Sequence, residues 1–359
     1  MQKIKPGKNL GVIEQEMLPS DYVAGANSPI PYVVNIIDGL WTGYESPGEP
    51  QTGVYVATQA CVSFSAVKAI VLQLNRMMKV GLIPASILDQ CRVQGYIDAN
   101  SGLFNFSERY VAKMSGTTQD GNSARTVWDT IRHYGLVGQQ VWPFPDTQRT
   151  PVFAWDDFYA PIPQSVIDQG KKFCNQDELP HLFDLVYEQV TDTSPASLEY
   201  HLKQSPLQVL TYTCPPWNTT DIIKACGIKP SSHATVIAGT QEDVWLVDLD
   251  SYNPWEKKLA WDYYINFAFK PVVTLAPQDV PVLPAPRNKA LEQLNAIAFK
   301  AFVYQKFAVT DVARTDASHN WSLLVNALTY QGYSMTDLIS WLYAHSHQHK
   351  EIFKLTQHK

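Results

Sequence analysis

Apolar residues recur at every third or fourth position through the first half of the chain, and this spacing predicts helices. The clearest stripe begins near Cys61 and stops before Gly81, a residue suited to a helix C-terminus. Its apolar members are Ala66, Ile70, Leu74 and Met77. Further helices are predicted over residues 84–94, from the N-cap Ser107, over 123–134 and over 194–204.

The pattern changes from helical to stranded after residue 205. Short runs rich in β-branched and aromatic residues, separated by turns, predict strands. They cover residues 206–213, 234–239, 244–249 and 267–273. The sequence therefore predicts an α+β fold, with a helical part over about residues 58–163 and a β-rich part over about 194–275.

Two further regions flank this predicted domain. Residues 1–57 are rich in Gly, Pro, Asn and Ser, which predicts an extended N-terminal segment. Residues 276–286 form a Pro-rich linker, and helical periodicity returns over 287–359. Residues 287–359 are predicted to form a small helical C-terminal domain that binds a protein partner or a second copy of the chain.

Composition excludes several classes of protein. The 359 residues carry 28 Lys+Arg and 34 Asp+Glu, a net charge of −6, so no basic excess favours nucleic acid. Aromatic residues at 12% and charged residues at only 17% argue against a disordered chain. No apolar run approaches the roughly 20 residues of a membrane span. Residues 1–17 are charged and lack the apolar core of a secretory signal, so a cytoplasmic protein is predicted.

The cysteines predict free thiols in a reducing compartment. There are five, Cys61, Cys91, Cys174, Cys214 and Cys226, at wide spacings and with no CxxC pair. Such a set is unlike a disulfide framework or a zinc site. The alternating histidines His345, His347 and His349 are better interpreted as a solvated helix end than as metal ligands. No metal and no cofactor are therefore expected.

Cys61 stands at the predicted start of the long apolar helix. Backbone N–H groups and the helix dipole favour an anion there, and such a position can lower a thiol pKa into the range of roughly 3.5–7.5. A cysteine on an apolar helix is more often a small buried hydrophobe, so this signal alone is weak.

A second candidate group lies in the β-rich half. His233 opens a predicted strand, and residues 239–243 join that strand to the next as a hairpin. If the strands pair antiparallel, an acid at the end of the second strand returns toward the imidazole and can fix its tautomer. Asp248 and Asp250, two residues apart, compete for this role. A lone histidine beside a strand is also commonly a satisfied core or surface residue.

Six passages in chain order resemble the papain-like cysteine peptidases. They are Cys61–Ala66, Phe106–Tyr110, Tyr134–Leu136 with Trp142–Phe144, Leu202–Val209, His233-Ala234 and Asp250–Tyr252. The separation of 17 residues between His233 and Asp250 fits that family and favours Asp250 over Asp248. The resemblance covers about residues 30–275 and is closest in look to papain-like proteins of tailed bacteriophages, which would make the protein virion-associated.

The resemblance implies a papain-like two-lobed fold and a thiol peptidase. Cys61 would be the nucleophile, His233 its acid–base partner and Asp250 the residue that orients the imidazole. Gln51 or Gln59 would complete the oxyanion hole, and Gly121 and Asn122 would bind the substrate backbone. The chain departs from the family pattern at Val62, usually Trp, and at Tyr55, where the oxyanion Gln is usually found.

Three functions are compatible with these residues. The first is a peptidase that hydrolyses polypeptides through an acyl-enzyme. The second is a peptidoglycan hydrolase or an acyl transferase with the same three residues. The third is a papain-like scaffold without turnover, for which Val62 and the displaced Gln argue.

Overall fold

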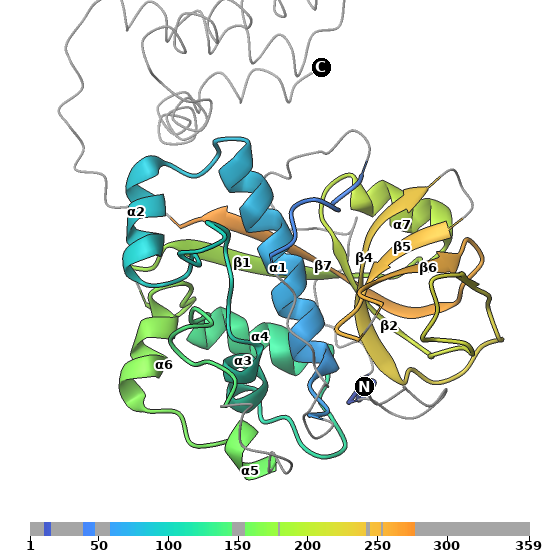
Figure 1. Cartoon of the computed structure of the whole chain (residues 1–359), viewed down its shortest axis with the longest axis horizontal. Helices are drawn as coiled ribbons and strands as arrows, with labels where there is room; N and C mark the ends of the chain where they lie inside the picture. The colour runs from blue at the N-terminus through green and yellow to red at the C-terminus, as the bar shows by residue number, and fades with distance from the viewer. Residues whose placement is uncertain are drawn as a thin grey trace, which may run out of the picture. The chain divides into compact units, whose positions relative to one another are not determined.

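The structure is a computed structural model (Figure 1), and the chain divides into two compact units, Met1–Gln278 and Asp279–Lys359. It describes residues 11–15, 39–46, 58–145, 155–178, 180–241, 245–252 and 254–276, all in the first unit. The predicted helical domain over 287–359 and the Pro-rich linker beyond Ala276 lie outside the described residues, as does most of the segment 1–57. Those assignments stay predictions.

The described chain has an α+β fold, as predicted. Its helices are α1 (Cys61–Lys79), α2 (Ala85–Val93), α3 (Glu108–Met114), α4 (Ala124–Tyr134), α5 (Trp155–Phe158), α6 (Gln164–Lys171) and α7 (Pro195–Leu202). The hydroxyls of Ser107 and Ser123 cap α3 and α4 by accepting hydrogen bonds from Tyr110 N at 3.1 Å and Thr126 N at 3.1 Å. These caps set the helix starts where the sequence predicts them.

One seven-stranded sheet forms the second half. Its strands are β1 (Phe183–Val190), β2 (Leu207–Thr211), β3 (Ile222–Ile223), β4 (His233–Gln241), β5 (Trp245–Leu249), β6 (Glu256–Ala260) and β7 (Ile265–Leu275). They lie in the order β1-β7-β2-β4-β5-β6-β3, and every pair is antiparallel except β3 with β6. Strand β7 is long because its second half pairs with β1 and its first half with β2.

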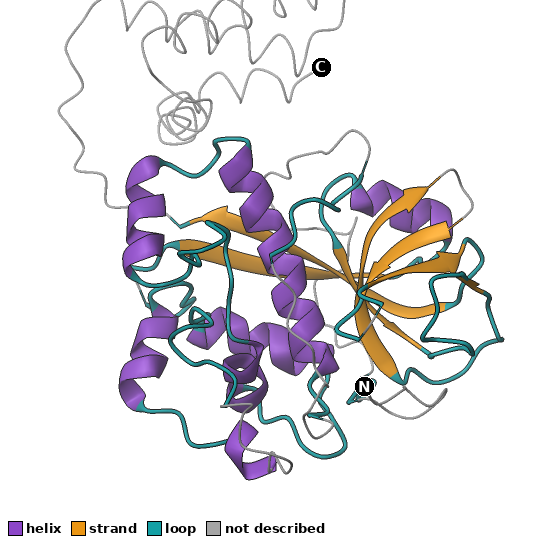
Figure 2. Ribbon diagram, in the orientation of Figure 1, coloured by secondary structure: helices purple, strands orange, loops and turns teal. Residues whose placement is uncertain are grey.

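Helix α1 lies between helices α2, α3 and α6 on one side and strands β4–β6 on the other, whereas α7 packs on the sheet (Figure 2), and α1 is buried along most of its length. Polar side chains join it to the strands. Gln73 donates to Pro271 O at 3.0 Å and accepts from Val273 N at 3.1 Å, so the middle of α1 is fixed to β7. The helical half and the strands therefore meet along α1, with Cys61 at its first turn.

Candidate active site

The first turn of α1 is fixed to strand β2. Cys61 is the first residue of the helix and is fully buried. The Gln208 side chain on β2 donates from Nε2 to Val62 O and to Ser65 Oγ, both at 2.8 Å. Ser65 Oγ in turn donates to Cys61 O at 2.8 Å. This network holds the backbone that carries the thiol in one position.

His233 and Asp250 are brought together by the β4–β5 hairpin. The strands pair antiparallel, with Val236 opposite Leu249, so the residue after β5 returns to the start of β4. His233 Nε2 lies 2.7 Å from Asp250 Oδ1, and both side chains are fully buried. Of the two acids that the sequence offered, Asp250 is therefore the one that contacts the imidazole.

The Asp250 carboxylate is surrounded by donors. Besides His233, Oδ1 accepts from Ser251 N at 2.6 Å. Oδ2 accepts from Trp217 Nε1 at 2.9 Å and lies 2.9 Å from Lys257 Nζ. Burial by itself would raise the pKa of Asp250, but the charges and hydrogen bonds of His233 and Lys257 outweigh it and hold that pKa below its usual range. Asp250 is therefore ionised at neutral pH.

The imidazole is held with one nitrogen left over. The rings of Trp217 and Tyr252 meet it edge-on, with centroids at 5.8 and 5.4 Å. Because Nε2 is engaged by Asp250, Nδ1 is the nitrogen that can exchange a proton. Nδ1 is buried and makes no hydrogen bond among the described residues.

The thiol of Cys61 lies beside the same strand. The backbone N–H of Ala234, the residue after His233, is near enough to the sulfur to lower the thiol pKa, whereas the Asp250 charge raises it. Burial raises the pKa of Cys61, and although the N–H groups of Ala234, Val62 and Cys61 oppose the rise, they do not cancel it. The lowered thiol pKa expected from the helix start is therefore not found while the Cys61 side chain is buried.

Asp248 is buried near the pair but does not join it. It lies two residues before Asp250 on β5, opposite Lys257 on β6. Burial raises the pKa of Asp248 to about 7, and the neighbouring Asp250 charge adds to the rise, while the Thr235 hydroxyl and the charge of Lys257 oppose it. At neutral pH this side chain is thus partly protonated.

Lys68 connects α1 to the acid from the other side. It follows Cys61 by seven residues, two helical turns, so both side chains lie on one face of α1. Its Nζ donates to the main-chain oxygen of Asp250 at 2.9 Å. One helix therefore supplies the thiol and fixes the backbone of the residue that holds His233.

The N-terminal segment 11–15 pairs with one of the predicted substrate-binding residues. Asn122 N donates to Gly11 O, and Ile13 N donates to Asn122 O, both at 2.8 Å, as a parallel β-bridge. Further along, Glu14 Oε1 accepts from Ser231 N at 2.7 Å, two residues before His233. The segment therefore runs from Asn122 to the start of β4.

The same segment packs against Gln59, two residues before Cys61 in the sequence. Gly11, with φ +114°, packs so closely that a Cβ there would lie 2.0 Å from Gln59 O. Gln59, half-buried, is the one described non-glycine residue with a left-handed φ, at 56°. Strained backbone of this kind is concentrated at functional sites. Gln51, the other predicted oxyanion residue, lies outside the described residues.

Gly121 and the Asn122 side chain serve the local turn. Gly121 exchanges backbone hydrogen bonds with Thr118 at 2.9 and 3.1 Å. Asn122 Nδ2 donates to Ser115 O at 2.9 Å and to Thr117 Oγ1 at 3.2 Å. The main chain of Asn122 faces the N-terminal segment, and Gly121 packs so closely on it that a Cβ there would lie 2.1 Å from Gly11 C. A substrate strand would therefore have to take the place of that segment.

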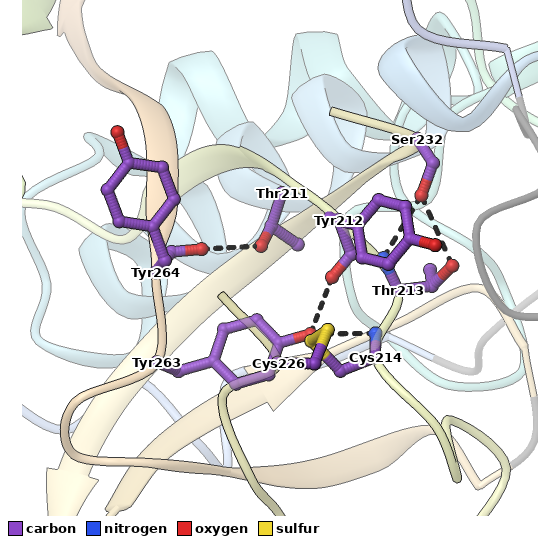
Figure 3. The surroundings of a disulfide bond; sticks show 8 residues. All are labelled: Thr211, Tyr212, Thr213, Cys214, Cys226, Ser232, Tyr263 and Tyr264. Atoms are coloured by element: carbon purple, nitrogen blue, oxygen red, sulfur yellow. Dashed lines mark hydrogen bonds between the residues drawn. A yellow bond between two sulfur atoms is a disulfide. The ribbon is translucent and has the colours of Figure 1, made fainter. Parts of the chain in front are cut away.

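The prediction of five free thiols is wrong for one pair. Cys214 and Cys226 form a disulfide (Figure 3), whereas Cys61, Cys91 and Cys174 are buried and not disulfide-bonded. Next to it, Tyr263 Oη accepts from Cys214 N at 3.0 Å and donates to Tyr212 O at 2.5 Å. Proximity in the fold, which the spacing of the cysteines does not reveal, brings the two sulfurs together.

The sequence does not predict a place in the site for three residues, Trp217, Lys257 and Lys68. Trp217 stands in a Pro-Pro-Trp turn, and Lys257 stands in a charged run that suggests a surface.

Among the described residues no cluster of His, Cys, Asp and Glu is arranged to hold a metal ion. In the same part of the chain, no helix is long and apolar enough to cross a membrane.

Comparison with known proteins gives a distant likeness to solved structures. No family model and no curated protein matches the chain. Among solved structures, it is similar to the bromelain protease from Ananas comosus in complex with the E64 inhibitor. The identity is 12%, the TM-score is 0.41, and the match covers 65% of this chain and 97% of that chain. A likeness of this degree does not identify a family, and none of these comparisons supports a bacteriophage origin.

Proposed function

We propose that the chain is a papain-like cysteine peptidase in which Cys61, His233 and Asp250 act together. One observation carries the proposal: the start of α1 and the β4–β5 hairpin bring a thiol to the residue after a histidine whose Nε2 is held by a buried carboxylate. The other imidazole nitrogen, Nδ1, is left for the thiol proton. Nucleophilic catalysis by a cysteine uses a thiol, a base and a group that orients the base, and in this proposal these three residues supply them.

The proposed reaction uses Nδ1 in both directions. His233 Nδ1 takes the proton of Cys61, and the thiolate adds to the carbonyl carbon of the peptide. The tetrahedral oxyanion is stabilised by N–H groups at the start of α1, with Gln59 or Gln51 as the proposed side-chain donor. Collapse breaks the C–N bond, and Nδ1 gives its proton to the leaving amine. Water, deprotonated by the same nitrogen, then cleaves the thioester and restores the thiol.

The proposed substrate is an extended polypeptide. The supporting contact is the β-bridge of Asn122 with Gly11 and Ile13, because main-chain N–H and C=O groups that bind one extended strand can bind another. In this proposal residues 11–15 occupy the place of the substrate and must leave it before turnover. Residues 287–359 remain the proposed partner-binding part.

A second candidate function also rests on a specific observation. Cys61 is fully buried and its pKa is raised, which are properties of a structural cysteine. A papain-like scaffold without turnover would have both properties. The scaffold and the enzyme differ in what happens when residues 11–15 are displaced. The Cys61 thiol of the enzyme would become reactive, whereas that of the scaffold would stay unreactive.

Turnover tests the proposal directly. Fluorescently labelled casein and purified cell wall are offered to Gly11→Val, in which residues 11–15 cannot keep their place, and to Gly11→Val combined with Cys61→Ala or with Cys91→Ala, the last as a control for another buried thiol. We expect release of casein peptides that is lost only in Cys61→Ala. Release from cell wall alone would favour the peptidoglycan hydrolase, and release that survives Cys61→Ala would overturn the assignment of the nucleophile.

A further inference from the structure

We propose that Lys257 is a positioning residue whose ammonium group neutralises Asp250, so that Asp250 orients His233 without fixing a positive charge on it. The inference rests on the proposed function, since it assigns a residue to the same reaction. Neither the sequence motifs nor the distant structural likeness points to Lys257.

The contacts of Lys257 identify it as part of the site. Its side chain is fully buried, which is rare for a lysine. Nζ lies 2.9 Å from Asp250 Oδ2 and donates to Tyr252 O at 2.8 Å and to Pro254 O at 2.5 Å. These three acceptors match the three N–H groups of an ammonium. The charge is therefore held against the carboxylate oxygen that does not contact His233.

The effect on His233 follows from the charges. A buried carboxylate beside an imidazole favours the protonated ring, because opposite charges attract strongly where water is excluded. The proposed reaction needs Nδ1 to release its proton to the leaving amine as readily as it takes one. With Lys257 on the far oxygen, Asp250 keeps its hydrogen bond to Nε2 while the net charge of the pair is zero. The pair thus does for His233 what a neutral amide acceptor would do.

The other charged groups around Asp250 do not replace Lys257. Lys68 on α1 binds the main-chain oxygen of Asp250 rather than its carboxylate, and its charge interacts more strongly with Glu45 than with Asp250. Asp248 on β5 is paired in register with Lys257 on the neighbouring strand β6, and it is partly protonated at neutral pH. Cys61 is uncharged in the closed arrangement because burial raises its pKa. Among the lysines that the structure describes around Asp250, Lys257 is thus the one whose ammonium group contacts the carboxylate.

The test follows the protonation of His233 by NMR of the full-length chain with ¹⁵N-labelled histidine, with the signal assigned from its loss in His233→Ala. The variants are Lys257→Met, Asp250→Asn and the double variant. The control is Lys270→Met, which removes another buried lysine paired with a buried acid, Glu188, at 2.8 Å. This readout does not require a reactive Cys61, so its outcome is separate from that of the turnover test.

We expect Lys257→Met to move the half-titration point of His233 upward by about 1–3 pH units, the effect of an uncompensated neighbouring charge. Asp250→Asn is expected to move it downward, and the double variant to return it near the wild-type point. Lys270→Met should leave it in place. If Lys257→Met does not fold, Asp250→Asn and the double variant still give the comparison. An unchanged titration in Lys257→Met, or a double variant that titrates like Asp250→Asn, would overturn the proposal.

Discussion

The indole Nε1 of Trp217 lies 2.9 Å from Oδ2 of Asp250, and Trp217 stands inside the loop that the Cys214–Cys226 disulfide closes. The cross-link thus bounds a segment that contacts both the acid and the ring of His233. The stability of the candidate site therefore depends on a covalent cross-link between two residues that are 12 positions apart in the sequence.

The disulfide gives the first prediction. Replacing both Cys214 and Cys226 by Ser should lower the free energy of unfolding by about 2–4 kcal/mol, because the unfolded chain regains the freedom that the cross-link removes. Urea unfolding measures the change. As a direct check, the unfolded wild-type chain should expose three thiols without a reductant and five with one. Five thiols in both cases would contradict the bond.

Displacing the N-terminal segment should expose the thiol. Gly11→Val places a side chain against Gln59 O at a position with φ +114°, so the segment cannot keep its place. We expect alkylation of Cys61 by iodoacetamide to rise about tenfold or more, equivalent to at least about 1.4 kcal/mol. Gly43→Val is the matched control, because Gly43 also has a positive φ, +88°, but open space around it. Equal rates in the two variants would show that the segment does not cover Cys61.

Asp248 predicts an unusual pH dependence of stability. Its pKa of about 7, raised by burial from 3.8, means that the folded chain keeps a proton which the unfolded chain loses between about pH 4 and 7. Its contribution to stability therefore falls as the pH rises through this window. Asp248→Asn should remove that loss, with a relative gain at about pH 8 on the order of a few kcal/mol over about pH 4.

Urea unfolding at the two pH values measures this difference, with the exposed Asp156→Asn as the control. The comparison is between variant and wild type at each pH, so other titrating groups cancel. A difference that is the same at both pH values would contradict the buried, protonated state of Asp248.

Local signals in the sequence were sufficient for much of the fold. Ser107 and Ser123 predict the starts of α3 and α4 because their hydroxyls replace missing backbone partners. The turn between the strands predicts the antiparallel β4–β5 hairpin, which in turn brings Asp250 to His233. The sequence pattern thus predicts those elements that depend on contacts between residues close in sequence, such as helix caps and hairpin turns.

The missed elements depend on contacts that are distant in sequence. Strand β1 has a charged residue, Glu188, at a buried position, where it pairs with Lys270 on β7. Strand β6 is similar, because Lys257 is buried against Asp250. Buried ion pairs of this kind interrupt the alternation of polar and apolar residues from which strands are predicted.

The most direct test of the central claim is the alkylation rate of each free cysteine, measured by mass spectrometry in the Gly11→Val background. We expect Cys61 to react at least about tenfold faster than Cys91 and Cys174, and His233→Ala to abolish the difference. If Cys61 reacts no faster than the other two, or if its rate is the same without the imidazole, then the thiol and the His233–Asp250 pair do not form a catalytic unit.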